Sequence, residues 1–133
     1  MPESFKIFMT RREAAARAYV TGDPEPVVAL SAMSGQATFF DPGGGFTKGA
    51  ETVNRSNREA SHLFGPSGTT RFEIHDQGES GDLAFWTGFQ IAEMEIAGKD
   101  GKVPMKLRIT EVFRRDGETW RMVHRHASLA KDG

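Results

Sequence analysis

The sequence contains no cysteine, only one tyrosine and almost no net charge. Without cysteine the chain can form no disulfide, no thiolate nucleophile and no cysteine-based zinc site. Its 17 Lys and Arg residues against 18 Asp and Glu residues give a net charge of -1. Non-specific nucleic-acid or membrane-surface binding needs an excess of positive charge, so we expect neither a nucleic-acid partner nor a membrane partner.

Long hydrophobic runs are also missing. The first residues contain no apolar run of signal-peptide length, and no later stretch is long and apolar enough to span a bilayer. The 133 residues suffice for one substantial core but not for two. We therefore expect a single domain over residues 1–133, located in the cytoplasm.

The first half of the chain has helical periodicity in three places. Apolar residues recur at three- and four-residue spacing over residues 5–21, which predicts an amphipathic helix. A short second helix is predicted from Asp23, and residues 49–64 predict a third. Residues 36–40 between them predict a brief strand that runs into a glycine-rich turn.

From residue 70 onward the chain predicts only strands. Hairpin signals separate four alternating segments, at residues 71–77, 83–96, 103–115 and 120–129. The predicted order is therefore helix, helix, strand, helix and four strands. This order is typical of the α+β class, with the helices packed on one face of a curved antiparallel sheet.

One acidic residue stands on an apolar strand face. Within residues 105–115, alternation places these side chains on the core face: Met105, Leu107, Ile109, Glu111 and Phe113. Burying an unpaired carboxylate is costly, so Glu111 must be protonated, paired or facing a wet cavity. A structural hydrogen bond or salt bridge to Arg12, Arg17 or Arg125 and a functional acid are both open alternatives.

The strand at residues 83–96 is apolar on both faces. Leu83, Phe85 and Phe89 point to one side, whereas Trp86 and Met94 point to the other. If helices cover one face of the sheet, a second copy of the chain is the economical cover for the other. We therefore predict a homodimer through the outer face of the sheet.

The last two predicted strands carry a recognisable set of residues: 114–117, Trp120, Val123, His124, His126 and Ser128. This end of the chain resembles the nuclear transport factor 2-like superfamily, in its SnoaL-like and ketosteroid-isomerase-like branch. It is also similar to the end of the association domain of calmodulin-dependent kinases. The resemblance implies a cone-shaped half-barrel, with a pocket between the concave sheet and the helices.

Two acidic positions match ketosteroid isomerases in particular. The segment at residues 37–43 is similar to the one that bears their general-base aspartate, which implies that role for Asp41. Glu111 falls where those enzymes carry the protonated acid of the oxyanion hole, so the resemblance implies a neutral Glu111. The place of their catalytic tyrosine falls near Ala15, and Tyr19 lies one turn later. Losing that donor would cost about 3–4 kcal/mol of transition-state stabilisation, so we do not expect true steroid isomerase activity.

The predicted ligand-binding residues are mostly aromatic or apolar. They are Tyr19, Phe40, Trp86, Gln90, Met94 and Phe113. Kinase association domains line their pocket with arginines, but the matching places hold Gln90, Glu111 and Ala127, so this chemistry is not expected. His124 and His126 share a strand face, yet no third ligand stands at an obvious spacing, so we predict no metal and no cofactor. His62 is expected on a helix surface, with a place at the pocket mouth as an acid or base as the alternative.

Two functions follow as competing hypotheses. The first is a cofactor-free acid/base isomerase, cyclase or hydrolase for a small apolar carbonyl or polyketide-like compound, with Asp41 and Glu111 as its catalytic pair. The second is a non-catalytic dimerisation or small-ligand-binding module. The two are distinguished by whether Asp41 and Glu111 face one cavity or are occupied by structural contacts.

Overall fold

The computed structural model describes residues 3–131. Over that range the chain forms three helices and six strands. The elements in order are α1 (Phe5–Tyr19), α2 (Glu25–Ala29), β1 (Thr38–Phe40), β2 (Phe46–Lys48), α3 (Ala50–Ser61), β3 (Thr69–Ser80), β4 (Leu83–Glu95), β5 (Lys102–Asp116) and β6 (Thr119–Leu129). The α+β class is confirmed, and so is the predicted order except for β2. That three-residue strand was not predicted.

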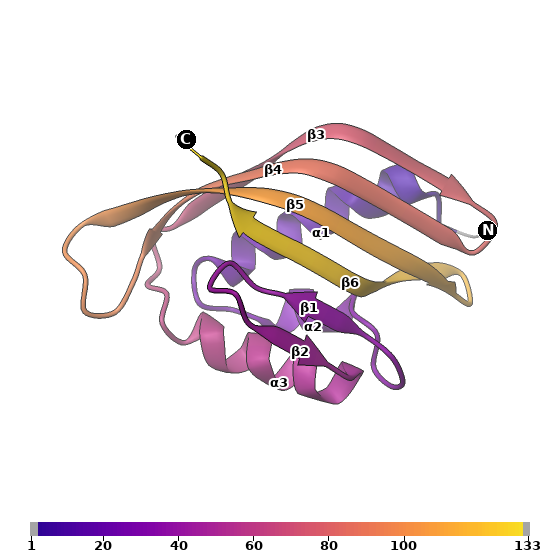
Figure 1. Ribbon diagram of the computed structural model, residues 1–133, viewed down its shortest axis with the longest axis horizontal. Helices are drawn as coiled ribbons and strands as arrows, with labels where there is room; N and C mark the ends of the chain where they lie inside the picture. Colours follow the sequence, from indigo (N-terminus) through magenta and orange to yellow (C-terminus); the bar gives the residue numbers. More distant parts are fainter. Residues whose placement is uncertain (1–2, 132–133) are drawn as a thin grey trace.

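The strands form one curved, unclosed sheet in the order β2-β1-β6-β5-β4-β3. Strands β3 to β6 are long antiparallel neighbours, whereas β1 and β2 are short and lie beyond β6 (Figure 1). The predicted antiparallel sheet is corrected in one place, because β1 runs parallel to β6. The sheet is therefore mixed.

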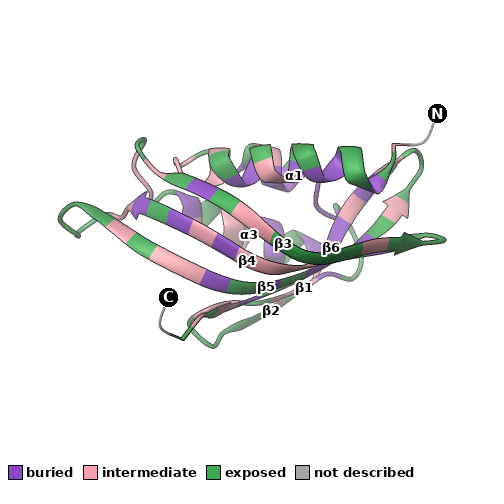
Figure 2. Cartoon of the chain, turned by 90° about the horizontal axis from the view of Figure 1, so that it is seen from above, coloured by how far each residue is buried: buried purple, intermediate pink, exposed green. Residues whose placement is uncertain are grey.

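The helices cover the concave face of this sheet. Figure 2 shows α1 lying along the sheet with its buried residues turned toward the strands. Phe5 and Phe8 from α1 each place their ring centroids 5.2 Å from that of Phe113 on β5. Trp120 on β6 packs edge-on against Phe5, so an aromatic cluster forms the core at this end of the sheet.

The predicted inner face of β5 is confirmed. Leu107, Ile109, Glu111 and Phe113 are all buried. On the opposite face of β4, Leu83 and Phe85 keep 49% and 37% of their surface exposed. In residues 3–131, no helix is long and apolar enough to cross a membrane.

Candidate functional site

A cavity of about 270 Å³ lies between the helices and the concave face of the sheet. At this end of the molecule α1 presents the small Ala16 and the aromatic Tyr19 to the space. Mostly small or flexible side chains complete its walls: Ala60 from α3, and Ala92, Met94 and Leu107 from the sheet. The walls of the cavity are therefore largely apolar.

Two arginines and a glutamine give this cavity a polar side. Arg12 comes from α1, Gln90 from β4 and Arg125 from β6, and all three line the cavity. Arg12 is only 3% exposed, even though it lies on the helix face that also buries Phe8 and Ala16. A charged residue in this position needs a partner, and the partner is Glu111.

Glu111 is fully buried and accepts hydrogen bonds from three side chains. Arg12 binds it in a bidentate manner, with Nε 2.9 Å from Oε1 and Nη2 2.7 Å from Oε2. The indole Nε1 of Trp86 donates to Oε1 at 2.7 Å, and Arg125 Nη1 donates to Oε2. The sequence alternative of a salt bridge to Arg12 or Arg125 is confirmed; Arg17 instead lies 4.0 Å from Glu13.

The charge state of Glu111 corrects the prediction of a neutral acid. Burial raises the pKa of its carboxyl, but the nearby charges of Arg12 and Arg125 and their hydrogen bonds outweigh burial. The pKa of Glu111 falls from its ordinary 4.5 to about 2. The side chain is thus an ionised acceptor at neutral pH and has no proton to donate to an oxyanion.

Tyr19 lies at the same cavity. Burial raises the pKa of its phenol, and this outweighs the opposite effect of Arg125 and Arg12. The hydroxyl therefore stays protonated at neutral pH and keeps a hydrogen to donate.

Asp41 lines the cavity from the turn between β1 and β2. Its Oδ1 accepts the backbone N–H of Gly43 at 2.9 Å and of Gly45 at 3.0 Å, so the carboxylate also stabilises that turn. Glu111 is not among the lining residues. The two predicted catalytic carboxylates therefore do not face one cavity: Asp41 borders it, and Glu111 contacts the arginines that border it.

Of the six predicted ligand-binding residues, three line the cavity: Tyr19, Gln90 and Met94. The other three are placed elsewhere. Trp86 is fully buried, with its ring stacked on Phe72 at 4.5 Å, and Phe113 belongs to the aromatic core. Phe40 points to the outer sheet face, where its ring centroid lies 5.1 Å from that of Phe46. Alternation along β1 brings Phe39, not Phe40, to the cavity.

Arg12 and Arg125 were predicted only as possible partners of Glu111, not as residues of the site. The signal for Arg12 was present, because an arginine on the apolar face of an amphipathic helix is unusual. Arg125 was harder to recognise as a site residue from the sequence. It lies directly across from Glu111 in the β5–β6 register, which the bulge between Val112 and Phe113 sets.

The histidines have other surroundings. His124 Nδ1 lies 2.7 Å from Thr38 Oγ1, and His75 Nε2 lies 2.8 Å from the carboxylate of Glu73. Within residues 3–131, no group of three His, Asp or Glu side chains is arranged to hold a metal ion. His62 is exposed at the end of α3, as expected.

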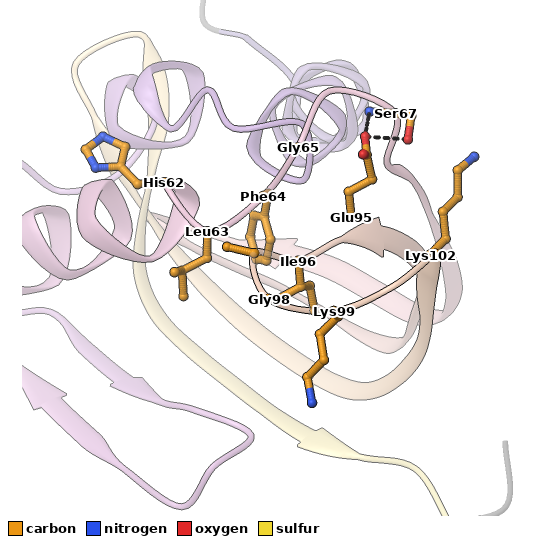
Figure 3. Close-up of a pocket in the computed structure, with 12 residues that line it drawn as sticks. His62, Leu63, Phe64, Gly65, Ser67, Glu95, Ile96, Gly98, Lys99 and Lys102 are labelled. Atoms are coloured by element: carbon orange, nitrogen blue, oxygen red, sulfur yellow. Dashed lines mark hydrogen bonds between the residues drawn. The ribbon is translucent and has the colours of Figure 1, made fainter.

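A second, open hollow lies beside His62 between the loop after α3 and the β4–β5 hairpin (Figure 3). There Glu95 Oε1 accepts the backbone N–H of Ser67 at 2.8 Å and its hydroxyl at 2.5 Å. The lysines at its edge, Lys99 and Lys102, are exposed. The Glu95 carboxylate therefore stabilises the loop after α3, and the hollow has no buried polar group that could contact a ligand.

The α+β architecture is the one found in solved proteins described as nuclear transport factor 2-like and as cystatin-like. The family profile described as SnoaL-like domain matches residues 11–132. The chain therefore belongs to the SnoaL-like domain family. The comparison with curated proteins gave no match.

Several solved structures share this architecture. A nuclear transport factor 2-like protein from Salmonella enterica superposes with a TM-score of 0.76 at 18% identity, covering 94% of this chain and 88% of the other. A Parabacteroides distasonis protein, provisionally described as a ketosteroid isomerase, gives 0.67 at 19% identity, with 95% and 87% covered. A Thiobacillus denitrificans protein, provisionally described as a calcium/calmodulin-dependent kinase II association domain, gives 0.67 at 19%, with 89% and 88% covered. At these identities the likeness shows the fold alone.

Proposed function

We propose that this protein binds a small, mostly apolar molecule in the cavity between α1, α3 and the sheet. The observation that carries the proposal is a space of about 270 Å³ with largely apolar walls and a few polar groups gathered on one side. Such a combination is typical of ligand pockets, in which apolar walls provide affinity and a few polar groups fix orientation.

Binding is favoured over isomerase-like catalysis by the contacts of Glu111. Its two oxygens already accept four hydrogen bonds from Arg12, Trp86 and Arg125, and its ionised form has no proton to share. Ala15, near the place of the isomerase tyrosine, is 2% exposed and packed in the core. The tyrosine and the protonated acid of that type of oxyanion hole are thus missing from their expected places.

Binding of the neutral probe 2-naphthol tests the proposal. Saturation-transfer NMR should show that the wild-type protein binds this probe. Ala60→Phe should abolish the signal, because the new ring fills the cavity that Ala60 borders. Ala14→Phe places the same ring on the exposed side of α1 and should leave binding intact. Equal binding to both variants would place the probe elsewhere and overturn the proposal.

Acid/base catalysis by Asp41 is the second candidate function. Asp41 Oδ1 is held by two backbone N–H groups, while its side chain also borders an apolar cavity, a setting in which a carboxylate can act as a general base. The probe reaction is the base-catalysed ring opening of 5-nitrobenzisoxazole, followed by its colour. Asp41→Asn should abolish turnover above the buffer rate, whereas Asp76→Asn on β3 should not. Turnover that survives Asp41→Asn would remove this candidate.

The homodimer through the outer sheet face stays a prediction, as does a cytoplasmic location. Leu83 and Phe85 on β4 and Phe40 and Phe46 at the β1–β2 edge support the dimer, because all four are exposed on that face. A second copy would remove this apolar surface from water. The molar mass of the protein in solution decides the question.

A further inference from the structure

The group at the polar side of the cavity carries an excess positive charge. Arg12 and Arg125 share one ionised partner, Glu111, which leaves one formal positive charge uncompensated among the three. Arg12 keeps 3% of its side-chain surface exposed, Arg125 keeps 17% and Glu111 none. Water therefore screens this charge poorly, and an anion placed here gains more than it would at a surface.

Both arginines also have hydrogen-bonding capacity left. Arg12 uses Nε and Nη2 on Glu111, and its Nη1 is buried with no hydrogen-bond partner. A buried donor without an acceptor is costly, and in a native protein such a group calls for an explanation. The Nη1 and Nη2 of Arg125 donate to Glu111 and Gln90, whereas its Nε has no hydrogen-bond partner among residues 3–131.

The neighbours of Arg125 hold it in position. Its Nη2 lies 2.8 Å from Gln90 Oε1, and Gln90 Nε2 in turn donates to Thr70 Oγ1 at 3.1 Å. Gln90 and Thr70 are both buried, so the guanidinium is fixed before any ligand arrives. Donors that are fixed in advance lose little entropy when a ligand binds.

The other acid at the cavity does not neutralise this group. Asp41 is half-buried in the turn between β1 and β2, and its oxygens make no salt bridge to either arginine. Its Oδ1 is directed to backbone N–H groups of the same turn. The excess positive charge therefore stays at the buried side of the cavity.

We propose that the ligand is a small carboxylic acid bound as its anion, with the carboxylate against Arg125 and Arg12 and an apolar body between Ala92, Met94 and Leu107. This proposal rests on the proposed function and specifies its ligand class. A planar guanidinium matches a carboxylate with two parallel hydrogen bonds, and the protonated hydroxyl of Tyr19 adds a donor at the same cavity. The volume of about 270 Å³ lies just below the roughly 300–1,000 Å³ usual for ligand pockets, so the body is small.

A matched set of probes with one body and different head groups tests this class. Phenylacetate, phenylacetamide and 2-phenylethylamine are titrated into the wild-type protein at pH 7 by calorimetry, in low and in high salt. Phenylacetate should bind about tenfold or more tightly than the amide, which is the factor that a charge-assisted hydrogen bond provides. The amine should bind most weakly, and added salt should reduce the preference for phenylacetate only slightly because the site is buried.

Two arginine variants then locate the carboxylate. Arg125→Met should remove the preference for phenylacetate over phenylacetamide, and the fold should survive because Glu111 keeps Arg12 and Trp86 as partners. Arg121→Met is the matched control, since Arg121 lies on the same strand but pairs with Asp116 on the surface. In this control the preference should stay at its wild-type value.

Each outcome separates this proposal from the proposed function. If phenylacetamide binds as tightly as phenylacetate, the pocket takes ligands but the carboxylate class is wrong. If 2-naphthol and all three head groups fail to bind, both proposals are wrong. A preference for phenylacetate that persists in Arg125→Met places the anion elsewhere and overturns the assignment to this group.

Discussion

Glu111→Gln should lower the free energy of unfolding by about 3–5 kcal/mol, the range expected when one partner of a buried ion pair is removed. The amide fills nearly the same volume as the carboxylate, so the loss reports charge and not packing. Arg12 and Arg125 would then lie side by side with no anion between them. Urea unfolding at pH 7, followed by circular dichroism, measures the change.

The matched control is Glu25→Gln. Glu25 also forms a bidentate contact with an arginine, Arg58, but its side chain is 61% exposed. Exposed pairs of this kind contribute little to stability, because water and salt screen them. Similar losses from the two variants would mean that the Glu111 cluster has no special importance for stability.

The same carboxylate should shape the acid unfolding of the protein. Its folded-state pKa of about 2 lies below the ordinary 4.5, so its contribution to stability is complete above pH 4.5 and is lost as the pH falls toward 2. The shift corresponds to on the order of 3 kcal/mol. The gap in stability between wild type and Glu111→Gln should therefore close across that pH window. A gap that stayed constant down to pH 2 would show that the charge of Glu111 is not its source.

Phe113→Ala should cost about 3–5 kcal/mol of unfolding free energy, because truncating a fully buried aromatic residue removes transfer free energy and leaves a cavity. Phe113 is 0% exposed and contacts the rings of both Phe5 and Phe8. The measurement is again the urea unfolding midpoint. Ligand affinity of the folded protein should not change, since Phe113 does not line the cavity.

Phe85→Ala is the control for this second prediction. Phe85 lies on β4, one strand away, with 37% of its surface exposed, so truncation should cost clearly less. If Phe113→Ala instead weakened ligand binding and left stability unchanged, Phe113 would be a pocket residue, as its sequence position suggested.

Alternation along the strands predicted which side chains share a face of the sheet. It did not predict which of the inward side chains border the cavity and which lie in the aromatic core. Residues 105–113 of β5 all alternate correctly, yet Leu107 borders the cavity and Phe113 lies in the aromatic core. The difference comes from α1, which brings Phe5 and Phe8 against one end of the sheet and only Ala16 and Tyr19 toward the other. No local pattern in the strand itself carries that information. For this reason the sequence placed Trp86 and Phe113 in the pocket together with Met94.

The character of Glu111 was predictable only in part. Its position on an apolar strand face followed from alternation. The cost of burying an unpaired carboxylate then required that Glu111 be protonated, paired or facing water. Its charge depends on how many cations reach it. Arg12 is 99 residues away in sequence and Arg125 is 14 residues away, and only the fold brings both to one carboxylate. The two nearby arginines stabilise the ionised form of Glu111. The ketosteroid-isomerase resemblance could not reveal this charge state.

The parallel pairing of β1 with β6 also has a consequence for folding kinetics. Strands β3 to β6 join neighbours in sequence through short hairpins, which close quickly, whereas Thr38 on β1 meets His124 across 86 residues. Closing so large a loop costs more entropy and slows the contact. We therefore expect the four-stranded meander to form first and the β1–β2 edge to dock late. The turn that carries Asp41 would then be among the last parts of the cavity to form and the first to open.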